Sequence, residues 1–283
     1  MFKQFIGKFY LQKPHWREPN INQCWGKCAM RSSEIAVTGI CAALYAVIGI
    51  LTSFGLSVGG VAFWPAVVVP AIFAVLFGPW VGGVGAAIGI FIRDVIYHGD
   101  PLLSLIAGVT SNFAMFFILG YFSHRRINPQ KTVLSAIIGG ILLVGGLLLP
   151  TFLLPAESLL FTGLSTSETI ALFAILATVS ILAVVAVFAF KKEWRTFSVG
   201  TVIGQGVGAA VVSVAVWAYS NLFYSQNGYF TAPLPPEFIP IIAVWTIATE
   251  IPFILILCPP IINVCYKAFP SLNRSHKNEE KAK

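Results

Sequence analysis

Charged residues are scarce in this sequence. Asp, Glu, Lys and Arg make up 10% of its 283 residues and hydrophobic residues 57%, whereas roughly a quarter of the residues in a soluble domain are charged. A large soluble core could explain the composition, but it does not explain apolar runs of about 20 residues. The shortage of charge therefore excludes an ordinary soluble domain and indicates a membrane protein.

Residues that bind metals or catalyse reactions are also few. Four His residues are too few and too scattered for a di-iron site, and no His or second Cys pair near Cys24 and Cys28 completes a zinc site. The sequence has no His-Glu-x-x-His, no Gly-x-Ser-x-Gly, no Walker lysine motif and no haem-attachment motif. We expect no enzyme, no metal site, no cofactor and no ATPase domain.

The sequence is instead rich in long apolar stretches. A membrane-spanning helix needs about 20 mostly apolar residues. We therefore predict an all-α polytopic membrane protein of about eight transmembrane helices, at residues 35–56, 61–77, 80–97, 102–122, 133–153, 169–190, 197–223 and 239–264. The second and third are short and separated only by Gly78 and Pro79, which fits either a tight turn or a re-entrant hairpin.

The basic residues predict the orientation. Seventeen of the 18 Lys and Arg residues fall in four blocks within 3–31, 125–131, 191–195 and 267–283, and only Arg93 lies outside them. With eight crossings all four blocks lie on one side, which the positive-inside rule makes the cytoplasm. We predict cytoplasmic termini, with an interfacial segment at 1–33, a transmembrane domain at 34–268 and a disordered tail at 269–283. Nucleic acid is not an expected partner.

The links predicted on the outer side contain no Lys or Arg. They are residues 57–60, 98–101, 154–168 and 224–238, and their charged residues are acidic. The last of these links is rich in aromatic and turn-forming residues. Because acidic links repel anions, we expect the outer side to have a weak preference for neutral or cationic ligands.

Five polar residues fall at membrane depth, where such groups are functional candidates. They are Arg93, Asp94, Asn112, Gln205 and Glu250. Asn112 and Gln205 fit hydrogen bonding between helices better than function. Arg93 and Asp94 are adjacent, so we expect their side chains to diverge. A role in binding ligand and a structural role are equally compatible with these two residues. Glu250, two residues before a helix-breaking proline, is the strongest candidate, and its structural alternative is a salt bridge to Arg93.

Small residues concentrate in the first three predicted helices. They recur four positions apart, at Ala42/Ala46, Gly82/Ala86, Gly83/Ala87 and Gly85/Gly89. Such spacing lets helix backbones approach closely. It fits packing within the bundle or a surface shared with another membrane protein, and the concentration favours the second.

The stretch 33–126 resembles the substrate-binding S components of energy-coupling factor (ECF) transporters. The resemblance is carried by the alanine-rich run at 40–47, by Pro65 and Pro70 ahead of the glycine-rich run at 74–89, and by Arg93-Asp94 with the turn at 99–101. Residues 204–262 fit the last two family helices more loosely. The family has six helices, so we interpret 133–190 as an inserted pair.

The resemblance implies a subunit that binds a small molecule, together with a coupling membrane subunit and two cytoplasmic ABC ATPases. It implies a coupling surface of small residues, which here would be Ala42, Ala46, Gly82, Gly85 and Gly89. It also places the ligand near the outer face. With the polar residues above, the predicted substrate-binding residues are Phe63, Trp64, Arg93, Asp94, Asn112, Asn221, Tyr229, Trp245 and Glu250.

Three functions follow as hypotheses. The first is capture of a vitamin-like or heteroaromatic molecule for an ECF-type importer, since aromatic side chains and a few polar anchors suit such a ligand. The second is a stand-alone secondary transporter that uses Glu250 for proton coupling, although no repeat of the two halves is evident. The third is a membrane enzyme or assembly factor.

Overall fold

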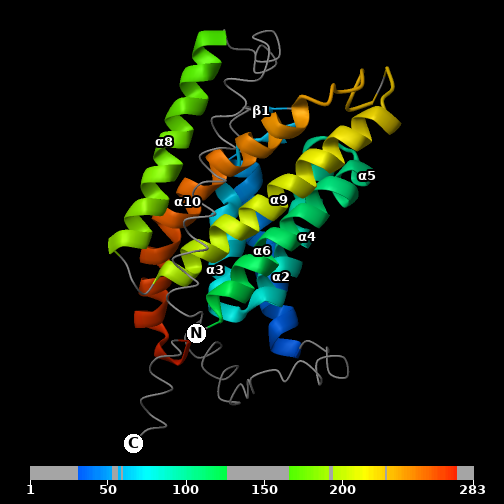
Figure 1. Cartoon of the computed structure of the whole chain (residues 1–283). Helices are drawn as coiled ribbons and strands as arrows, with labels where there is room; N and C mark the ends of the chain where they lie inside the picture. Colours follow the sequence, from blue (N-terminus) through cyan, green and yellow to red (C-terminus); the bar gives the residue numbers. More distant parts are fainter. Residues whose placement is uncertain are drawn as a thin grey trace, which may run out of the picture.

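The computed structural model is a bundle of long helices (Figure 1). It describes residues 31–52, 57–58, 60–125, 166–190, 194–226 and 228–272. Its long helices are α2 (Ser32–Leu51), α4 (Pro79–Tyr97), α6 (Thr110–Ser123), α8 (Thr166–Phe190), α9 (Arg195–Leu222) and α10 (Phe238–Ala268). Five segments of the described chain are long and apolar enough to cross a membrane. The prediction of an all-α polytopic membrane protein is thus confirmed.

The predicted helix 61–77 is only partly helical. Its first residues form β2 (Val61–Ala62), which pairs antiparallel with β1 (Ser57–Val58). A 3₁₀ turn η2 (Pro65–Val67) then leads into α3 (Val68–Phe77). Ten residues of α-helix rise about 15 Å, half the thickness of a bilayer core of about 30 Å. The α3 helix therefore does not span a membrane by itself.

Proline and glycine set the boundaries of the middle helices. Gly78 has φ +116° and lets the chain reverse between α3 and α4. Pro79 occupies the first turn of α4, where a missing N–H is tolerated. The side chain of Asp100 caps the short α5 (Pro101–Leu103) by accepting the N–H groups of Leu102 and Leu103.

A π-helical segment, η3 (Ser104–Val109), joins α5 to α6. The predicted helix 102–122 is therefore one continuous helical path with a widened turn near its start. Such turns are rare and are frequent at functional sites. The chain ends its described part in a 3₁₀ turn, η6 (Pro270–Leu272).

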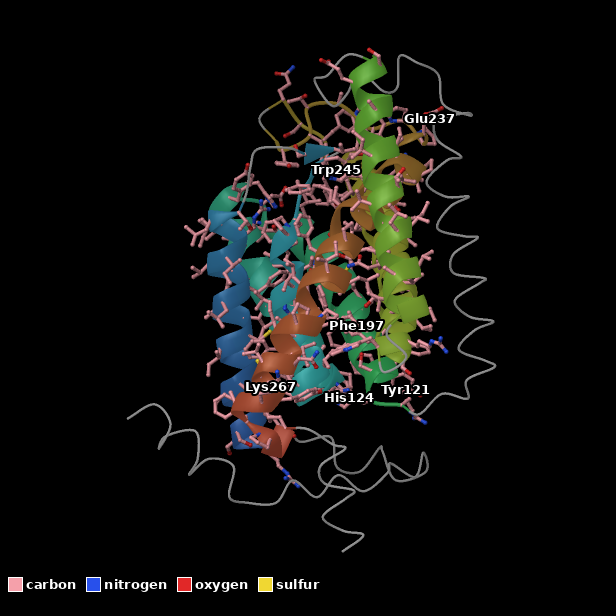
Figure 2. All side chains as sticks on the ribbon, turned by 90° about the vertical axis from the view of Figure 1, so that its left-hand side faces the viewer. Tyr121, His124, Phe197, Glu237, Trp245 and Lys267 are labelled. Atoms are coloured by element: carbon pink, nitrogen blue, oxygen red, sulfur yellow. The ribbon has the colours of Figure 1, made fainter. Side chains whose placement is uncertain are left out.

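The two ends of the bundle differ in charge. One described residue from each basic block lies at a helix end: Arg31 before α2, Arg125 after α6, Arg195 at the start of α9 and Lys267 at the end of α10. These four helix ends lie together in Figure 1. Figure 2 shows Lys267, His124 and Tyr121 at this end and Glu237 at the other. The geometry agrees with four basic blocks on one side of the membrane.

The hydrophobic core is built from side chains of α2, α3, α6 and α10 and of the segment after β2. Its largest buried side chains include Trp245, Tyr45, Phe116 and Leu119. Outward faces of α2, α4 and α10 carry exposed Ile, Leu and Val, as expected of surfaces in contact with lipid. The predicted helix 133–153, most of segment 1–33 and most of tail 269–283 lie outside the described residues.

Candidate ligand-binding cavity

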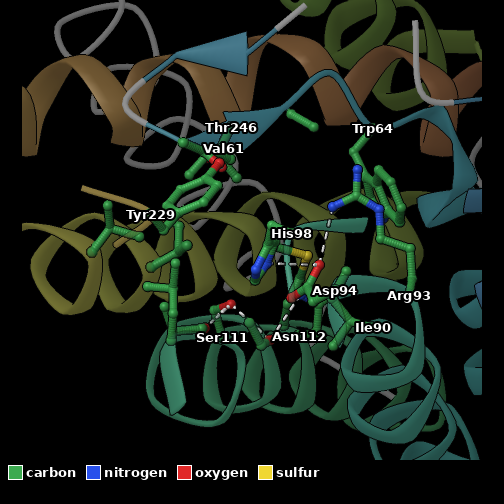
Figure 3. Close-up of a pocket in the computed structure, with 18 of the residues that line it drawn as sticks. Val61, Trp64, Ile90, Arg93, Asp94, His98, Ser111, Asn112, Tyr229 and Thr246 are labelled. Atoms are coloured by element: carbon green, nitrogen blue, oxygen red, sulfur yellow. Dashed lines mark hydrogen bonds and ion pairs between the residues drawn. The ribbon is translucent and has the colours of Figure 1, made fainter. Parts of the chain in front are cut away.

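A small cavity opens between α4, η3, α6, α9 and α10, at the end of the bundle away from Arg31, Arg125, Arg195 and Lys267 (Figure 3). Its volume is about 80 Å³. Polar and aromatic side chains line it together with aliphatic ones. Those used below are Trp64, Arg93, Asp94, His98, Ser111, Asn112, Tyr229, Phe230, Thr246 and Glu250.

Arg93 is buried in the wall of the cavity. Its guanidinium lies 4.3 Å from the ring centre of Trp64 and 4.1 Å from that of Tyr97, so it is stacked against two rings. Its Nη1 donates to Asp94 Oδ1 at 3.0 Å. The expectation that these two neighbours diverge is wrong, because the long arginine side chain bends back to reach the carboxylate.

Asp94 is surrounded by donors. Besides Arg93, its Oδ2 accepts the hydroxyl of Ser104 at 2.8 Å, and His98 Nε2 lies 3.7 Å from Oδ1. The Nδ1 of His98 accepts the N–H of Asp100 at 3.3 Å, which leaves the hydrogen of a neutral imidazole on Nε2, facing Asp94. A side chain at Gly108 would meet Asp94 Oδ2 at 2.6 Å, so the π-helical segment provides the room for this cluster.

A chain of hydrogen bonds connects the aromatic wall to α6. Trp64 Nε1 donates to the hydroxyl of Tyr45 at 2.6 Å, and that hydroxyl donates to Asn112 Oδ1 at 2.6 Å. The amide of Asn112 then donates to Gly108 O at 2.9 Å. Asn112 thus links α2 to α6, which confirms its predicted role between helices, and it also lines the cavity.

Glu250 contributes a carboxyl group from α10. Its Oε2 accepts Gln205 Nε2 of α9 at 3.0 Å. This bond confirms the predicted interhelical role of Gln205, and it replaces the predicted alternative of a salt bridge between Glu250 and Arg93. Glu250 has a relative exposure of 6%, and Thr246 lies one turn before it on the same face.

Pro252 affects the backbone next to Glu250. A proline cannot donate to the carbonyl four residues earlier, which leaves Ala248 O without its helical donor. The hydroxyl of Ser180 of α8 is shared between this oxygen, at 3.0 Å, and Leu176 O of its own helix, at 2.7 Å. The α8 helix therefore docks on α10 at the carbonyl that the proline frees.

Two chain segments cover the cavity: the β1–β2 hairpin, which contains Gly60, and the loop between α9 and α10, which contains Tyr229 and Phe230. Tyr229 donates its hydroxyl to Gly60 O at 3.3 Å and lies with its ring centre 5.0 Å from that of His98. Burial raises the pKa of Tyr229, although Arg93 acts in the opposite direction, so the phenol stays a donor at neutral pH. Gly60 has φ +86°, and this conformation turns its carbonyl toward the loop.

Six of the nine predicted substrate-binding residues line this cavity: Trp64, Arg93, Asp94, Asn112, Tyr229 and Glu250. The other three lie elsewhere. Phe63 packs on Phe253 and Trp245, because successive residues of an extended chain face opposite sides. Trp245 donates to Val61 O, and Asn221 donates to Leu234 O, so both hold the covering segments in place.

The predicted coupling residues are covered within the chain. Ala42 and Ala46 are 3% and 4% exposed. A Cβ on Gly89 would lie 2.7 Å from Ala42 O, one on Gly85 would lie 2.7 Å from Cys41 Sγ, and Gly82 abuts Ala74. We name Cys41, Ala42, Gly85 and Gly89 the small-residue contact. The spacing serves close approach of α2, α3 and α4 within the chain, and a role of these residues at a partner surface stays a prediction.

Sequence reasoning missed His98, Ser111, Phe230 and Thr246 of the lining. A single histidine beside a turn gives no signal of its own, and a threonine in an apolar helix does not stand out. The signal that was available for His98 is its position four residues after Asp94. Among the described residues, no cluster of three or more His, Cys, Asp or Glu side chains could hold a metal ion.

The fold and cavity define a multi-pass helical membrane protein with a polar site for a small molecule. Comparison with known proteins gives the family. The family model of the S component of the ECF-type riboflavin transporter matches residues 30–191, more than half of the chain. The chain therefore belongs to this family of transporter components, which confirms the resemblance. The interpretation of 133–190 as an inserted pair stays a prediction.

Two relatives are similar to parts of the chain. A UPF0397 protein of Streptococcus gordonii is 32% identical over 117 residues, which cover 37% of this chain and 62% of the relative. An uncharacterized protein in the gap 3' region of Pyrococcus woesei is 38% identical over 74 residues, covering 26% of this chain and 47% of the relative. The chain thus spans less than two thirds of either relative. No solved structure matches the chain.

Proposed function

We propose that this chain is the substrate-binding subunit of an ECF-type importer that takes up a vitamin-like or heteroaromatic molecule. The observation that carries the proposal is the cavity, which collects Arg93, Asp94, Asn112 and Glu250 at one end of an otherwise apolar bundle. Intramembrane ionisable groups around a cavity are typical of substrate sites. Family membership supports the same reading, and riboflavin, which the family description names, is one candidate substrate.

The cavity end of the bundle faces outward in this proposal. Apart from Arg93, the Lys and Arg residues that the structure describes lie at the opposite end, where the positive-inside rule puts the cytoplasm. Both termini are then cytoplasmic. Ligand enters from outside through the cover formed by Gly60, Tyr229 and Phe230.

The cover must open for a ligand of this class. Pockets for small molecules have volumes of about 300–1,000 Å³, and the described cavity has about 80 Å³. The bond between Tyr229 and Gly60 joins the two covering segments. When this bond breaks, the loop between α9 and α10 can separate from the β1–β2 hairpin, and the hydrogen bonds of Arg93, Asp94 and Asn112 stay intact.

Release of ligand requires a coupling membrane subunit and two cytoplasmic ABC ATPases, because the sequence has no nucleotide-binding motif of its own. The available surface on α2 is the face opposite the small-residue contact. Ala36, Gly39 and Ala43 are exposed there, and nothing lies within 4 Å of a Cβ built on Gly39. We place the coupling subunit on this face.

Co-expression tests this function. The full chain should co-purify with a coupling subunit and ATPases, and a small molecule identified by mass spectrometry should co-purify with it. Ala43→Trp should abolish assembly and leave ligand binding intact, whereas Val214→Trp, on the exposed face of α9, should change neither. Uptake that continues without ATPases and stops when the proton gradient collapses would instead establish the secondary transporter.

A further inference from the structure

The two carboxyl groups of the cavity differ in their partners. Asp94 lies beside a guanidinium, a hydroxyl and an imidazole. Glu250 has one hydrogen bond among the described residues, to the amide of Gln205. An amide is a neutral donor and leaves a carboxylate charge uncompensated.

A buried carboxylate without a cation is costly. Removing an ion from water is unfavourable even after the protein relaxes, and a nearby opposite charge offsets that cost. Arg93 is the one Lys or Arg that lines the cavity in the described part of the chain, and it pairs with Asp94. The site as described therefore has a carboxyl group in its wall with no cation opposite it.

The surroundings of Glu250 define the shape of what can reach it. Aromatic rings of Trp64, Tyr229 and Phe230 and the aliphatic side chains of Ile90 and Met115 line the same cavity. Flat rings pack well against such walls. Thr246, one turn from Glu250, adds a hydroxyl on the same face of α10.

We infer that the ligand is a heteroaromatic molecule carrying a positively charged or protonated nitrogen, and that this nitrogen pairs with Glu250. The inference rests on the proposed function and specifies its substrate class. A neutral ring, such as that of riboflavin, satisfies the aromatic walls and leaves the carboxyl group unpaired, so the site disfavours that candidate and discriminates by charge. Asp100, at the same end of the bundle, attracts the same class of molecule.

Two vitamin-like probes of similar size test the charge preference. 1-Methylnicotinamide is a permanent pyridinium cation, and nicotinamide is neutral. Their dissociation constants would be measured by calorimetry on the full chain in lipid nanodiscs. We expect wild type to bind the cation more tightly by about tenfold or more. Glu250→Gln, which keeps an acceptor for Gln205, should abolish that preference.

The matched control is Glu237→Gln, an exposed carboxylate at the start of the same helix, which should keep the preference. Equal binding of both probes, no binding of the cation by wild type, or a preference that survives in Glu250→Gln would overturn the inference. If Glu250→Gln does not fold, the wild-type comparison alone decides. A neutral co-purified molecule would refute the inference and leave the proposed function standing, whereas failure to assemble with ATPases would refute the function.

Discussion

The small-residue contact and the cavity are two ways of holding membrane helices together. In the first, α2 and α4 approach until Gly89 faces the backbone oxygen of Ala42, and no side chain fits between them. In the second, α4, α6, α9 and α10 stay apart and are joined by polar pairs such as Arg93–Asp94 and Gln205–Glu250. Lipid tails are as apolar as leucine, so both means are needed in place of a hydrophobic driving force.

The difference bears on where the molecule can move. A contact made by backbones leaves no alternative arrangement, whereas polar side chains around a cavity can exchange partners with a ligand. We therefore expect ligand-linked motion on the cavity side, with α2 and α4 moving as one unit. The predictions below disrupt one region at a time, from the largest expected effect to the smallest.

Replacing Arg93 should have the largest effect. Arg93→Leu leaves the Asp94 carboxylate buried without its cation, and breaking a buried pair in this way costs about 3–5 kcal/mol. The free energy of unfolding, measured by denaturant titration in mixed micelles, should fall by that amount. Arg125→Leu removes an exposed guanidinium near Tyr121 and should change it by less than about 1 kcal/mol. Equal losses in both variants would contradict the role given to the buried pair.

The small-residue contact is tested by making the same change, glycine to alanine, at a packed position and at an open position of the bundle. Gly89→Ala puts a methyl group 2.7 Å from Ala42 O, and overpacking of this kind costs about 1–3 kcal/mol. Gly39→Ala adds the same group where nothing lies within 4 Å and should raise the free energy of unfolding by about 0.5–1 kcal/mol, because alanine is the better helix former. Ligand affinity should be unchanged in both. A stable Gly89→Ala would show that α2 and α4 can separate, against the expectation of a single rigid unit.

Ser180 tests the docking of α8 beside the cavity. Ser180→Ala leaves the carbonyl of Ala248 without a donor, and interhelical bonds in membranes are worth about 0.6 kcal/mol on average, up to about 1.7. The free energy of unfolding should fall within that range. Thr178→Ala is the control, because that hydroxyl bonds to Ala174 O of its own helix. If the two variants lose the same amount, the bond to α10 contributes nothing specific.

The sequence alone was sufficient to predict which charged residues belong to the site. Arg93, Asp94 and Glu250 stand out because ionisable residues are rare in apolar helices. Asn112 stands out for a related reason, since a buried amide must find hydrogen-bonding partners. Their meeting in one cavity required the fold, because α4, α6 and α10 are far apart in the sequence.

The sequence could not predict which side chains face the cavity or the bundle interior and which face away. Phe63 and Trp64 are equally aromatic, but only Trp64 faces the cavity, and alternation along an extended chain does not say which of two successive residues faces inward. Ala42 and Ala43 are equally small, but Ala42 is buried and Ala43 exposed. Small-residue spacing reports close approach of helices without saying whether the partner belongs to the same chain.

The weakest expected effect on stability is at the cover. Tyr229→Phe removes the bond to Gly60 O and keeps the ring beside His98, so the free energy of unfolding should change by no more than about 0.5–1.5 kcal/mol. The rate at which the co-purified ligand dissociates should rise several-fold, because the two covering segments then separate more readily. Tyr224→Phe, an exposed tyrosine of the same loop, should leave that rate unchanged. A rate unaltered in Tyr229→Phe would mean that ligand leaves the cavity by a route other than the gap between the loop and the hairpin.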